Sequence, residues 1–446
     1  MLNLFDTLSG KLVEFKPLEQ GRVKLYACGM TVYDKAHLGH ARTTVTVDIL
    51  VRLLKYLYSD VVYVRNITDV DDKINARARE ENLPLAKLTS RIIDQCNDDM
   101  LYLGNIRPSY EPKVTEHLED IISLVEKLIA SGNAYISNNH VFFAVDSYSD
   151  YGRLSRLDQN ELFNAVRIEE NTSKKNPLDF VLWKPSLADD DESIKFNSPW
   201  GIGRPGWHIE CSAMSHRYLG NNFDIHCGGM DLKFPHHENE IAQSRCAFRN
   251  SDFAKLWFHI GFLMVDGEKM SKSLKNFITV DELRCRGTAG SVVRLAMLKN
   301  HYRKPLNFSW NLITEMENFL KSLHRSIVGI EAKYLVPDEI VDNLCDDLNI
   351  PKALATLSEF NKTGELAKLK NAMIFLGIFD EHLLENSHST MDEKRKAEIE
   401  SLINDRTRAK DRKDWKQADE IRDRLKSEGI TIKDTRDGTI WESAEK

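Results

Sequence analysis

The sequence predicts an α/β protein with a parallel sheet, an insertion within that part, and a helical region after it. Strand and helix patterns alternate over about the first 110 residues and return after about residue 200. Between these stretches the pattern changes to short strands and polar segments, which indicates an inserted domain. Beyond about residue 290 amphipathic segments dominate, which is typical of a helical bundle, and a small terminal unit follows.

The first α/β repeat starts at residues 23–27, where an apolar run predicts a short strand. The next segment predicts a helix, because its apolar residues recur at helical spacing: Ile49, Leu50, Leu53, Leu54 and Leu57. Residues 61–65 are rich in β-branched and aromatic side chains and predict a second strand, and residues 69–80 predict a second helix. This alternation favours a parallel sheet whose strands are joined by helices.

Similar patterns of apolar and polar residues predict the elements of the insertion and of the second α/β part. A helix is expected through residues 121–128 and a strand at residues 141–145, followed by a polar stretch at residues 188–192. The α/β pattern then resumes with a strand, a helix and an apolar run, at residues 223–229, after Pro235 and at 257–265.

Helices dominate the rest of the chain. Amphipathic segments predict the bundle at residues 315–330, 340–348 and 352–376. The last segment, from about residue 391, contains a helix around residues 415–422, then a short apolar run and Trp441.

The composition excludes several classes of protein. The 446 residues are 42% hydrophobic and 29% charged, an ordinary globular mixture that suggests about three packed units. The 61 Lys and Arg against 68 Asp and Glu give a net charge of -7, so an RNA partner needs a local patch. The start lacks a signal peptide, the most apolar stretch (residues 45–64) is interrupted by charges, and the seven cysteines form no C-x-x-C pair. We therefore expect a cytoplasmic protein with no membrane span.

Two histidines with a glycine between them, His37, Gly39 and His40, open the helix that follows the first strand. Histidines three residues apart face the same point, here above the carboxyl edge of the sheet. A helix N-terminus offers free N–H groups, the glycine lets a nucleotide approach the backbone, and the imidazoles can donate to phosphate oxygens. Alone, the pair favours an ordinary surface helix.

A second motif follows the turn at residues 266–268 and consists of Lys269, Met270, Ser271, Lys272 and Ser273. Two mobile ammonium groups and two hydroxyls suit a polyphosphate, on which negative charge builds as pyrophosphate leaves. Lysines that close over this group stabilise the transition state more than the ground state. With both motifs on one α/β frame, a nucleotide site is a better interpretation than a solvated basic loop.

Together these motifs resemble the signatures of the class I aminoacyl-tRNA synthetases, and the chain resembles the cysteinyl-tRNA synthetases over nearly its full length. Further segments carry this resemblance at residues 28–33, 65–69, 198–201, 206–212 and 226–232. The resemblance implies a monomer that uses ATP to join L-cysteine to tRNA(Cys) through cysteinyl adenylate, with Mg2+ bound to the ATP. The implied catalytic residues are His37, His40, Lys269 and Lys272.

The resemblance also implies six parts in chain order. The first three are one half of a Rossmann-type catalytic domain, an inserted connective domain for the acceptor end, and the second half, at residues 1–110, 111–200 and 201–260. The others are the lysine loop with a stem-contact region, the helical bundle, and a C-terminal anticodon-binding domain, at residues 261–300, 301–390 and 391–446. In the last domain, Trp441 is expected to stack on unpaired bases.

Four scattered residues are candidate metal ligands. Cys28 follows the first strand, Cys211 lies in a segment that would return to the same sheet edge, and His236 and Glu240 are one helical turn apart. From spacing alone, small buried thiols and a surface histidine are the more ordinary interpretation. The resemblance instead implies one zinc ion held by these four residues. Zinc prefers a thiolate to a hydroxyl, so it would distinguish cysteine from serine where an apolar pocket does so weakly.

Further contacts are assigned by the resemblance. ATP is expected to meet Gly39, Gly228, Gly229, Asp231, Met270, Ser271 and Ser273. The amino acid is expected to meet Gly29, Thr68 and Trp207. Glycine turns and buried tryptophans are common, so these positions also have a purely structural interpretation. Two neighbours of the ligands in sequence, Cys227 and His237, are expected outside the metal site.

Two other functions stay open at this point. Related cysteine ligases resemble the catalytic half but pass the amino acid to an amino sugar, and they need no anticodon unit such as the tail after about residue 391. An inactive tRNA-binding protein is the second alternative, and the intact signatures argue against it. Exchange of pyrophosphate into ATP distinguishes this last case.

Overall fold

The computed structural model divides into two compact units, Met1–Asp380 and Glu381–Lys446. The structure describes residues 1–157, 161–162, 173–187, 190–270, 276–333, 335–381, 383, 393–412, 414–428, 430–435 and 438–443. Within these ranges, no helix is both long and apolar enough to cross a membrane.

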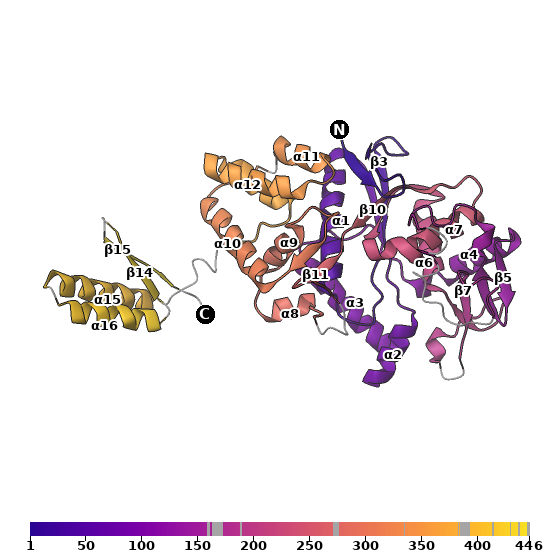
Figure 1. The fold of residues 1–446 in the computed structure, drawn as a ribbon, viewed down its shortest axis with the longest axis horizontal. Coiled ribbons are helices and arrows are strands. Elements are labelled where there is room, and N and C mark those ends of the chain that lie inside the picture. Colours follow the sequence, from indigo (N-terminus) through magenta and orange to yellow (C-terminus); the bar gives the residue numbers. More distant parts are fainter. Residues whose placement is uncertain are drawn as a thin grey trace. The chain divides into compact units, whose positions relative to one another are not determined.

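A four-stranded parallel sheet forms the centre of the first unit (Figure 1). Its strands run in the order β10 (Phe253–Ile260), β9 (Asn222–Gly229), β3 (Arg22–Ala27) and β4 (Asp60–Arg65). The predicted strands at residues 23–27, 61–65 and 223–229 are therefore confirmed. Strands β3 and β9 are neighbours although about 200 residues separate them, so their carboxyl ends meet at one edge of the sheet.

Helix α1 (Leu38–Leu57) joins β3 to β4 and packs against the sheet and against α9 (Gly290–Leu298). Its apolar residues from Val45 to Leu54 are buried, as their helical spacing predicts. Ten residues, 28–37, connect the end of β3 to the start of α1, and the N-terminus of the helix lies beside the end of β3, because Cys28 and His37 line the same pocket.

In the sequence, helices and a second sheet lie between strands β4 and β9 of the parallel sheet. Helices α2 (Asp72–Glu81), α3 (Leu85–Tyr102) and α4 (Leu118–Ala130) come first. The second sheet is antiparallel, in the order β5-β6-β7-β8, with strands at Ala134–Ser137, His140–Phe143, Phe180–Pro185 and Gly203–Pro205. The chain then returns to the parallel sheet through α6 (Trp207–Leu219), and α7 (Glu238–Ala247) follows β9.

A small three-stranded sheet follows β10 and is made of β11 (Leu263–Val265), β12 (Glu268–Lys269) and β13 (Leu306–Phe308). The predicted apolar run at residues 257–265 is thus divided between β10 and β11. Strand β13 lies beyond residue 290, where the sequence pattern indicated mainly helices; it is three residues long and pairs with β11, about 40 residues earlier in the sequence. So short a strand has no periodicity to detect.

The first unit also contains a two-stranded antiparallel sheet near the start of the chain, β1 (Asn3–Asp6) with β2 (Lys11–Glu14), and further helices after β11. These helices are α8 (Val280–Cys285), α10 (Trp310–Ser326), α11 (Asp338–Cys345), α12 (Ile350–Thr363) and α13 (Leu366–Phe375). The amphipathic segments predicted at residues 315–330, 340–348 and 352–376 are confirmed as helical over most of their lengths.

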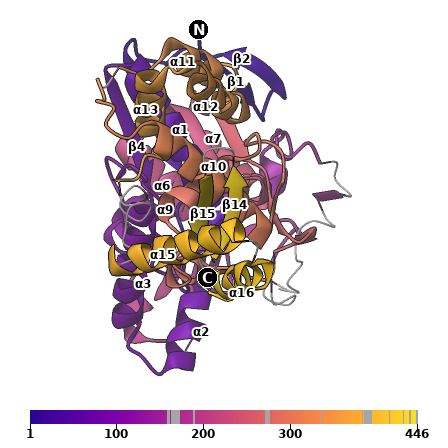
Figure 2. The same cartoon turned by 90° about the vertical axis from the view of Figure 1, so that its left-hand side faces the viewer.

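The second unit packs α15 (Glu393–Asp411) against α16 (Trp415–Ser427), beside the hairpin of β14 (Ile430–Thr435) and β15 (Gly438–Ser443) (Figure 2). Its core is formed by Ile399, Ile403, Leu425 and Ile430. Trp441 is partly buried against this core, which opposes the expectation that its ring stacks on bases. Trp415, at the start of α16, is 60% exposed.

A candidate active site beside a metal centre

A pocket of about 370 Å³ lies at the carboxyl edge of the parallel sheet, beside the N-terminus of α1. It brings together nine of the residues expected from the sequence: Cys28, Gly29, His37, Gly39, His40, Trp207, Gly229, Asp231 and Met270. These residues come from segments up to about 240 positions apart, so the fold itself assembles the site.

The two histidines of α1 cap their own helix. His37 is the N-cap residue, and the Nδ1 atom of each ring accepts the backbone N–H of the other, at 3.2 and 3.3 Å. The rings stack with centroids 3.6 Å apart. A neutral imidazole whose Nδ1 accepts a hydrogen bond carries its proton on Nε2, so each ring has an Nε2–H donor. Burial and the neighbouring His37 hold the pKa of His40 well below its usual range, which favours this neutral form.

Gly39 leaves the backbone at the start of α1 accessible. A Cβ atom at this position would lie 2.9 Å from the His37 ring and 3.4 Å from the Met270 Cε atom. Met270 follows β12 and therefore closes the pocket from the side of the lysine motif. The backbone of Lys269 lies in β12, whereas Ser271, Lys272 and Ser273 lie outside the described residues.

The two glycines after β9 differ in their surroundings. Gly229 lines the pocket with Asp231, and a Cβ atom on Gly229 would lie 2.4 Å from Asp231 Oδ1. Gly228 does not line the pocket, and a Cβ atom there would lie 2.6 Å from the His237 ring. Its small size therefore admits a histidine ring, and the expected contact with ATP is not what the geometry shows for Gly228.

The residues expected to bind the amino acid also separate into two groups. Gly29 and Trp207 line the pocket, and Trp207 stacks on His236 with ring centroids 4.3 Å apart. Thr68 is buried and does not line the pocket, because its hydroxyl donates to Glu210 Oε2 at 3.2 Å. Thr68 therefore supports the wall of the pocket in this structure.

Four ligand-bearing side chains meet next to the pocket, and Cys28 is the one that lines it. Cys28 Sγ lies 3.9 Å from Cys211 Sγ and 3.6 Å from Glu240 Oε1, and His236 Nε2 lies 3.1 Å from that same oxygen. All the ligand atoms of this group lie within 4.8 Å of one another, so together they could hold a metal ion. Apart from Cys28, which is half-buried, these side chains are inaccessible to solvent.

A second grouping shares Cys28 and Glu240 but takes His226 and His237 in place of the other two residues. His237 Nε2 lies 3.3 Å from Cys28 Sγ and 4.0 Å from Glu240 Oε1. The expectation that His237 stands apart from the metal site is therefore too simple, because its ring borders the same thiol. His226 Nε2 lies 2.8 Å from Glu240 Oε2, the carboxylate oxygen on the other side from His236. The described geometry places Cys227 in neither grouping.

The electrostatics of the cluster favour a cation. Burial and the neighbouring Cys211 thiol raise the pKa of Cys28 well above its usual range. Burial and nearby histidines lower the pKa of His236 well below its usual range. A bound metal reverses the first effect, since it stabilises the thiolate, and it requires the neutral imidazole that the second effect supplies.

Other residues of the pocket were not predicted. Thr43 and Thr44 lie three and four positions after His40 on the same helix, so helical spacing could have identified them. Phe262 and Phe277 flank the lysine motif, and Lys73 comes from α2. These three positions belong to none of the sequence motifs described above.

Comparisons with known proteins agree with this geometry. Residues 14–318 match the model of the tRNA synthetases class I (C) catalytic domain. The fold is shared with a Mycobacterium tuberculosis methionyl-tRNA synthetase in complex with methionyl-adenylate, with TM-score 0.56 and 16% identity, over 80% of this chain and 89% of that one. It is also shared with a ternary LeuRS–tRNA–LeuAMS complex from Agrobacterium radiobacter K84, with TM-score 0.58 and 12% identity, over 84% and 85% of the chains. The first unit is thus a catalytic unit of the class I synthetases.

The remaining matches narrow the class. Residues 392–441 match the cysteinyl-tRNA ligase anticodon binding domain. A cysteine–tRNA ligase of Wolbachia sp. subsp. Drosophila simulans is 47% identical over 98% of this chain and 99% of its own length. A cysteine–tRNA ligase of Rickettsia felis is 46% identical over 98% of both chains. The chain belongs to the cysteine–tRNA ligase family.

Proposed function

We infer that the chain joins L-cysteine to tRNA(Cys) in two steps at the pocket of α1. In the first step a carboxylate oxygen of cysteine attacks the α-phosphorus of ATP, and the bond to pyrophosphate breaks. In the second step a hydroxyl of the terminal ribose of tRNA attacks the acyl carbon, and AMP leaves. The observation that carries this proposal is that the capped histidine pair and Cys28 line one pocket, and that the ligand atoms of Cys211, His236 and Glu240 lie within 4.8 Å of the Cys28 sulfur.

The histidine pair binds and orients phosphate oxygens. The Nδ1 atoms of His37 and His40 are engaged by backbone N–H groups, so their Nε2–H groups supply the donors. The free N–H groups and the positive dipole end of α1 add to the attraction for an anion. ATP is expected to arrive with Mg2+, which neutralises part of its charge.

The lysine motif stabilises the departing pyrophosphate in this proposal. Lys269 and Lys272 meet negative charge that develops only as the phosphorus–oxygen bond breaks, with Ser271 and Ser273 beside them. The position of Met270 in the pocket wall, close to Gly39, supports this arrangement because it brings the start of the motif to the nucleotide.

The binding of ATP and cysteine divides along the pocket. Gly39 and Gly229 allow adenosine and phosphates to approach the backbone, and Asp231 can accept a ribose hydroxyl or the ammonium group of cysteine. Gly29 and Trp207 face the amino acid. Thr68 acts through Glu210, and Gly228 acts through His237, so both shape the pocket from behind.

One zinc ion per chain fits the cluster of Cys28, Cys211, His236 and Glu240. A tetrahedral zinc with ordinary bond lengths needs about 3.8 Å between two sulfur ligands, about 3.6 Å between sulfur and oxygen, and about 3.3 Å between nitrogen and oxygen. The three observed separations are 3.9, 3.6 and 3.1 Å. When bound there, zinc would supply a soft Lewis acid that prefers a sulfur ligand to a hydroxyl oxygen.

His226 and His237 suit a supporting role in this proposal. His226 holds Glu240 Oε2 and thereby turns Oε1 toward the two thiols, as partners behind the ligands of a metal commonly do. His237 Nδ1 lies 2.8 Å from His259 Nε2, which fixes its ring beside Cys28. The grouping with two cysteines is preferred to the grouping with His226 and His237, because zinc binds a second thiolate more readily than a second imidazole.

Transfer of cysteine to an amino sugar is not favoured. The second unit matches an anticodon binding domain, which a ligase for a small acceptor does not need. We also propose that the protein acts in the cytoplasm, where tRNA and ATP meet, and as a monomer, because the sequence of one chain contains every residue proposed for the site.

The experiment that tests this function supplies purified full-length chain with ATP, cysteine and one of two acceptors. Acid-stable attachment of cysteine to tRNA(Cys) transcript, with no product on glucosamine, is the expected result. Product on glucosamine alone supports the amino-sugar ligase. Pyrophosphate exchange without any charging of tRNA contradicts the second step.

A further inference from the structure

A small cavity of about 120 Å³ lies apart from the pocket of the proposed reaction and shares none of its lining residues. Three cationic side chains line it: Arg156 of the inserted part, Lys233 after β9, and Arg303 before β13. No carboxylate of the described residues lines it. We call this feature the Lys233 cavity. Pockets for drug-sized ligands have about 300–1,000 Å³, so this one suits a small ion.

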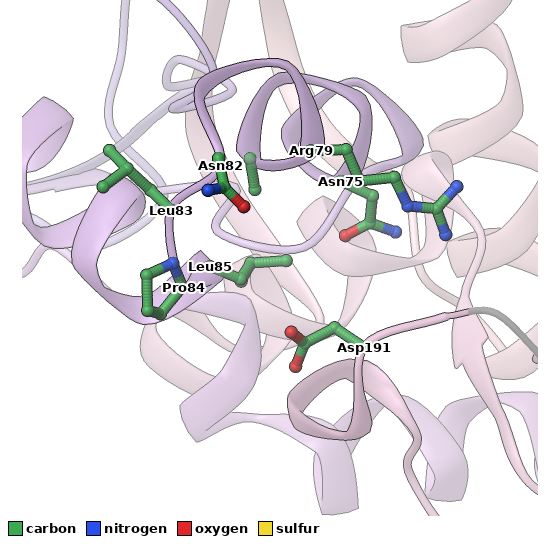
Figure 3. A pocket seen from close by; sticks show the side chains of 8 residues that line it. Asn75, Arg79, Asn82, Leu83, Pro84, Leu85 and Asp191 are labelled. Atoms are coloured by element: carbon green, nitrogen blue, oxygen red, sulfur yellow. The ribbon is translucent and has the colours of Figure 1, made fainter.

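A larger cavity beside α2 shows a different balance of charge (Figure 3). Its volume is about 550 Å³, and its wall contains Arg79 together with the carboxylate of Asp191. Arg79 also lies 3.9 Å from Asp190. The cation there is offset by carboxylates of the protein itself, so the cavity beside α2 does not call for a bound anion.

Two of the three cations of the Lys233 cavity have no carboxylate partner among the described residues. Arg303 does have one, because Asp347 Oδ2 lies 2.6 Å from its Nη2 atom and 2.8 Å from its Nε atom. Arg156 Nη2 donates to two backbone carbonyl groups of residues 7 and 8, at 3.4 and 3.3 Å. Lys233 Nζ donates to the backbone carbonyl of Ser155 at 3.0 Å. The described wall therefore carries two positive charges without a counterion.

One buried carboxylate near Lys233 is engaged elsewhere. The two oxygens of Glu238 accept the backbone N–H groups of Leu154 and Ser155, at 3.4 and 2.7 Å. Burial and the neighbouring Arg156 lower the pKa of Lys233. An anion between the two cations would oppose both effects, because it replaces lost solvation and offsets the repulsion of like charges.

The guanidinium group of Arg156 is held in place although the residue is exposed as a whole. Its backbone has φ +59°, in the left-handed region, and its side chain crosses to the N-terminal segment. A Cβ atom on Gly10 would lie 2.0 Å from Arg156 Nη2, so the absence of a side chain at Gly10 admits the guanidinium. A fixed guanidinium presents its N–H groups in one plane, which suits the oxygens of a phosphate.

We propose that the Lys233 cavity binds one free tetrahedral oxyanion, inorganic phosphate, between Arg156 and Lys233. The ion would join the inserted part to residues 230–233, the segment that also brings Asp231 to the pocket of α1. The inference does not depend on the proposed function, because binding of phosphate is measured whether or not the chain charges tRNA.

The test measures binding of inorganic phosphate to the full-length chain by titration calorimetry at constant ionic strength. A non-hydrolysable analogue of cysteinyl adenylate fills the pocket of α1 throughout. We expect one phosphate per chain, and at least about tenfold weaker binding in Lys233→Met and in Arg156→Met, each of which removes one cation. Arg153→Met is the matched control, since Arg153 pairs with Asp150 at 3.3 Å and does not line the cavity. It should bind phosphate like the unaltered chain.

Thermal unfolding without phosphate shows whether each variant is folded. If Arg156→Met is not, Lys233→Met alone decides, because Lys233 contributes one hydrogen bond to the backbone. No binding to the unaltered chain, or equal affinities in Lys233→Met and Arg153→Met, overturns the inference. Binding seen only while the pocket of α1 is empty overturns it as well, since the phosphate then lies in that pocket. Competition between phosphate and tRNA, with weaker tRNA binding by Lys233→Met, also overturns it and assigns these cations to the RNA backbone.

Discussion

The two carboxylate oxygens of Glu240 contact different residues of the cluster. Oε1 faces Cys28 at 3.6 Å and His236 at 3.1 Å, while Oε2 is held by His226 at 2.8 Å. A carboxylate held from one side in this way presents a single oxygen to a metal. The same arrangement makes the competing set, with His226 and His237 as ligands, distinguishable by substitution.

We predict that His236→Ala loses most of the bound zinc, whereas His237→Ala keeps it. The reason is that His236 Nε2 lies 3.1 Å from Glu240 Oε1, whereas His237 Nε2 lies 4.0 Å from the same oxygen. Elemental analysis of the purified variants by mass spectrometry measures the metal content directly. Zinc that stays in His236→Ala and leaves in His237→Ala would assign the metal to the second grouping.

Lys272→Ala is predicted to slow cysteine activation, because the transition state loses about 2–4 kcal/mol of stabilisation. The Michaelis constant for ATP should change little. The ammonium group meets charge that exists only as pyrophosphate departs, so the ground state loses little. Steady-state pyrophosphate exchange separates the two quantities. A large rise in the Michaelis constant with unchanged turnover places this lysine in ground-state binding instead.

The sequence could predict residues that act within one motif but not all that act across the fold. The spacing of His37 and His40 predicted a shared site, and both line the pocket. Cys28 and Cys211 are 183 positions apart, so only family resemblance could pair them. The side chain of Thr68 turns to Glu210, and a single sequence gives no sign of that contact.

Among the elements, α1 is fixed by a buried charge. Arg42 donates to the backbone carbonyl groups of Gly261, Met297 and Lys304, at 3.1, 3.0 and 2.6 Å. Burial lowers the pKa of Arg42 to about 10, which leaves the guanidinium charged at neutral pH. The residue thus joins the helix of the histidine pair to the segment that leads into the lysine motif.

We predict that Arg42→Met destabilises the first unit by about 2–5 kcal/mol, because buried carbonyl groups lose their donor. Lys55→Met on the exposed side of the same helix is the control and should change stability by less than about 0.5 kcal/mol. Denaturant unfolding measures both. Equal stabilities of the two variants would show that water or neighbouring groups replace the guanidinium.

Helices and strands with a clear periodicity of apolar residues could be predicted from the sequence. A strand that forms only by pairing with a segment distant in the sequence could not. The parallel strands, α1 and the later helices follow their apolar patterns. Strand β13 depends on pairing with β11 some 40 residues earlier, and its three residues carry no pattern of their own. Local periodicity therefore describes the framework but not the small sheet, whose strand β12 contains Lys269.

At the scale of the whole molecule, we expect the first unit to activate cysteine without the second unit, and efficient charging of tRNA to require both units. The residues proposed for cysteine activation lie between Cys28 and Ser273, whereas the match to an anticodon binding domain covers residues 392–441. Each unit has its own core, so removal of the second leaves the first with its buried contacts intact.

Deletion of residues 391–446 is predicted to leave cysteine-dependent pyrophosphate exchange nearly unchanged and to lower charging of tRNA at least about a hundredfold. The measurement is both rates on the same preparation. An equal loss of both rates would make the second unit part of the catalytic fold. Full charging by the shortened chain would show that the anticodon contacts are dispensable.

The proposed function depends on activation of cysteine at the pocket of α1, and pyrophosphate exchange tests this most directly. Labelled pyrophosphate should enter ATP when the purified full-length chain is given cysteine, and serine should support exchange less efficiently by a factor of about 10⁴. Exchange that is equally efficient with serine, or that requires an amino acid other than cysteine, would contradict the proposed function.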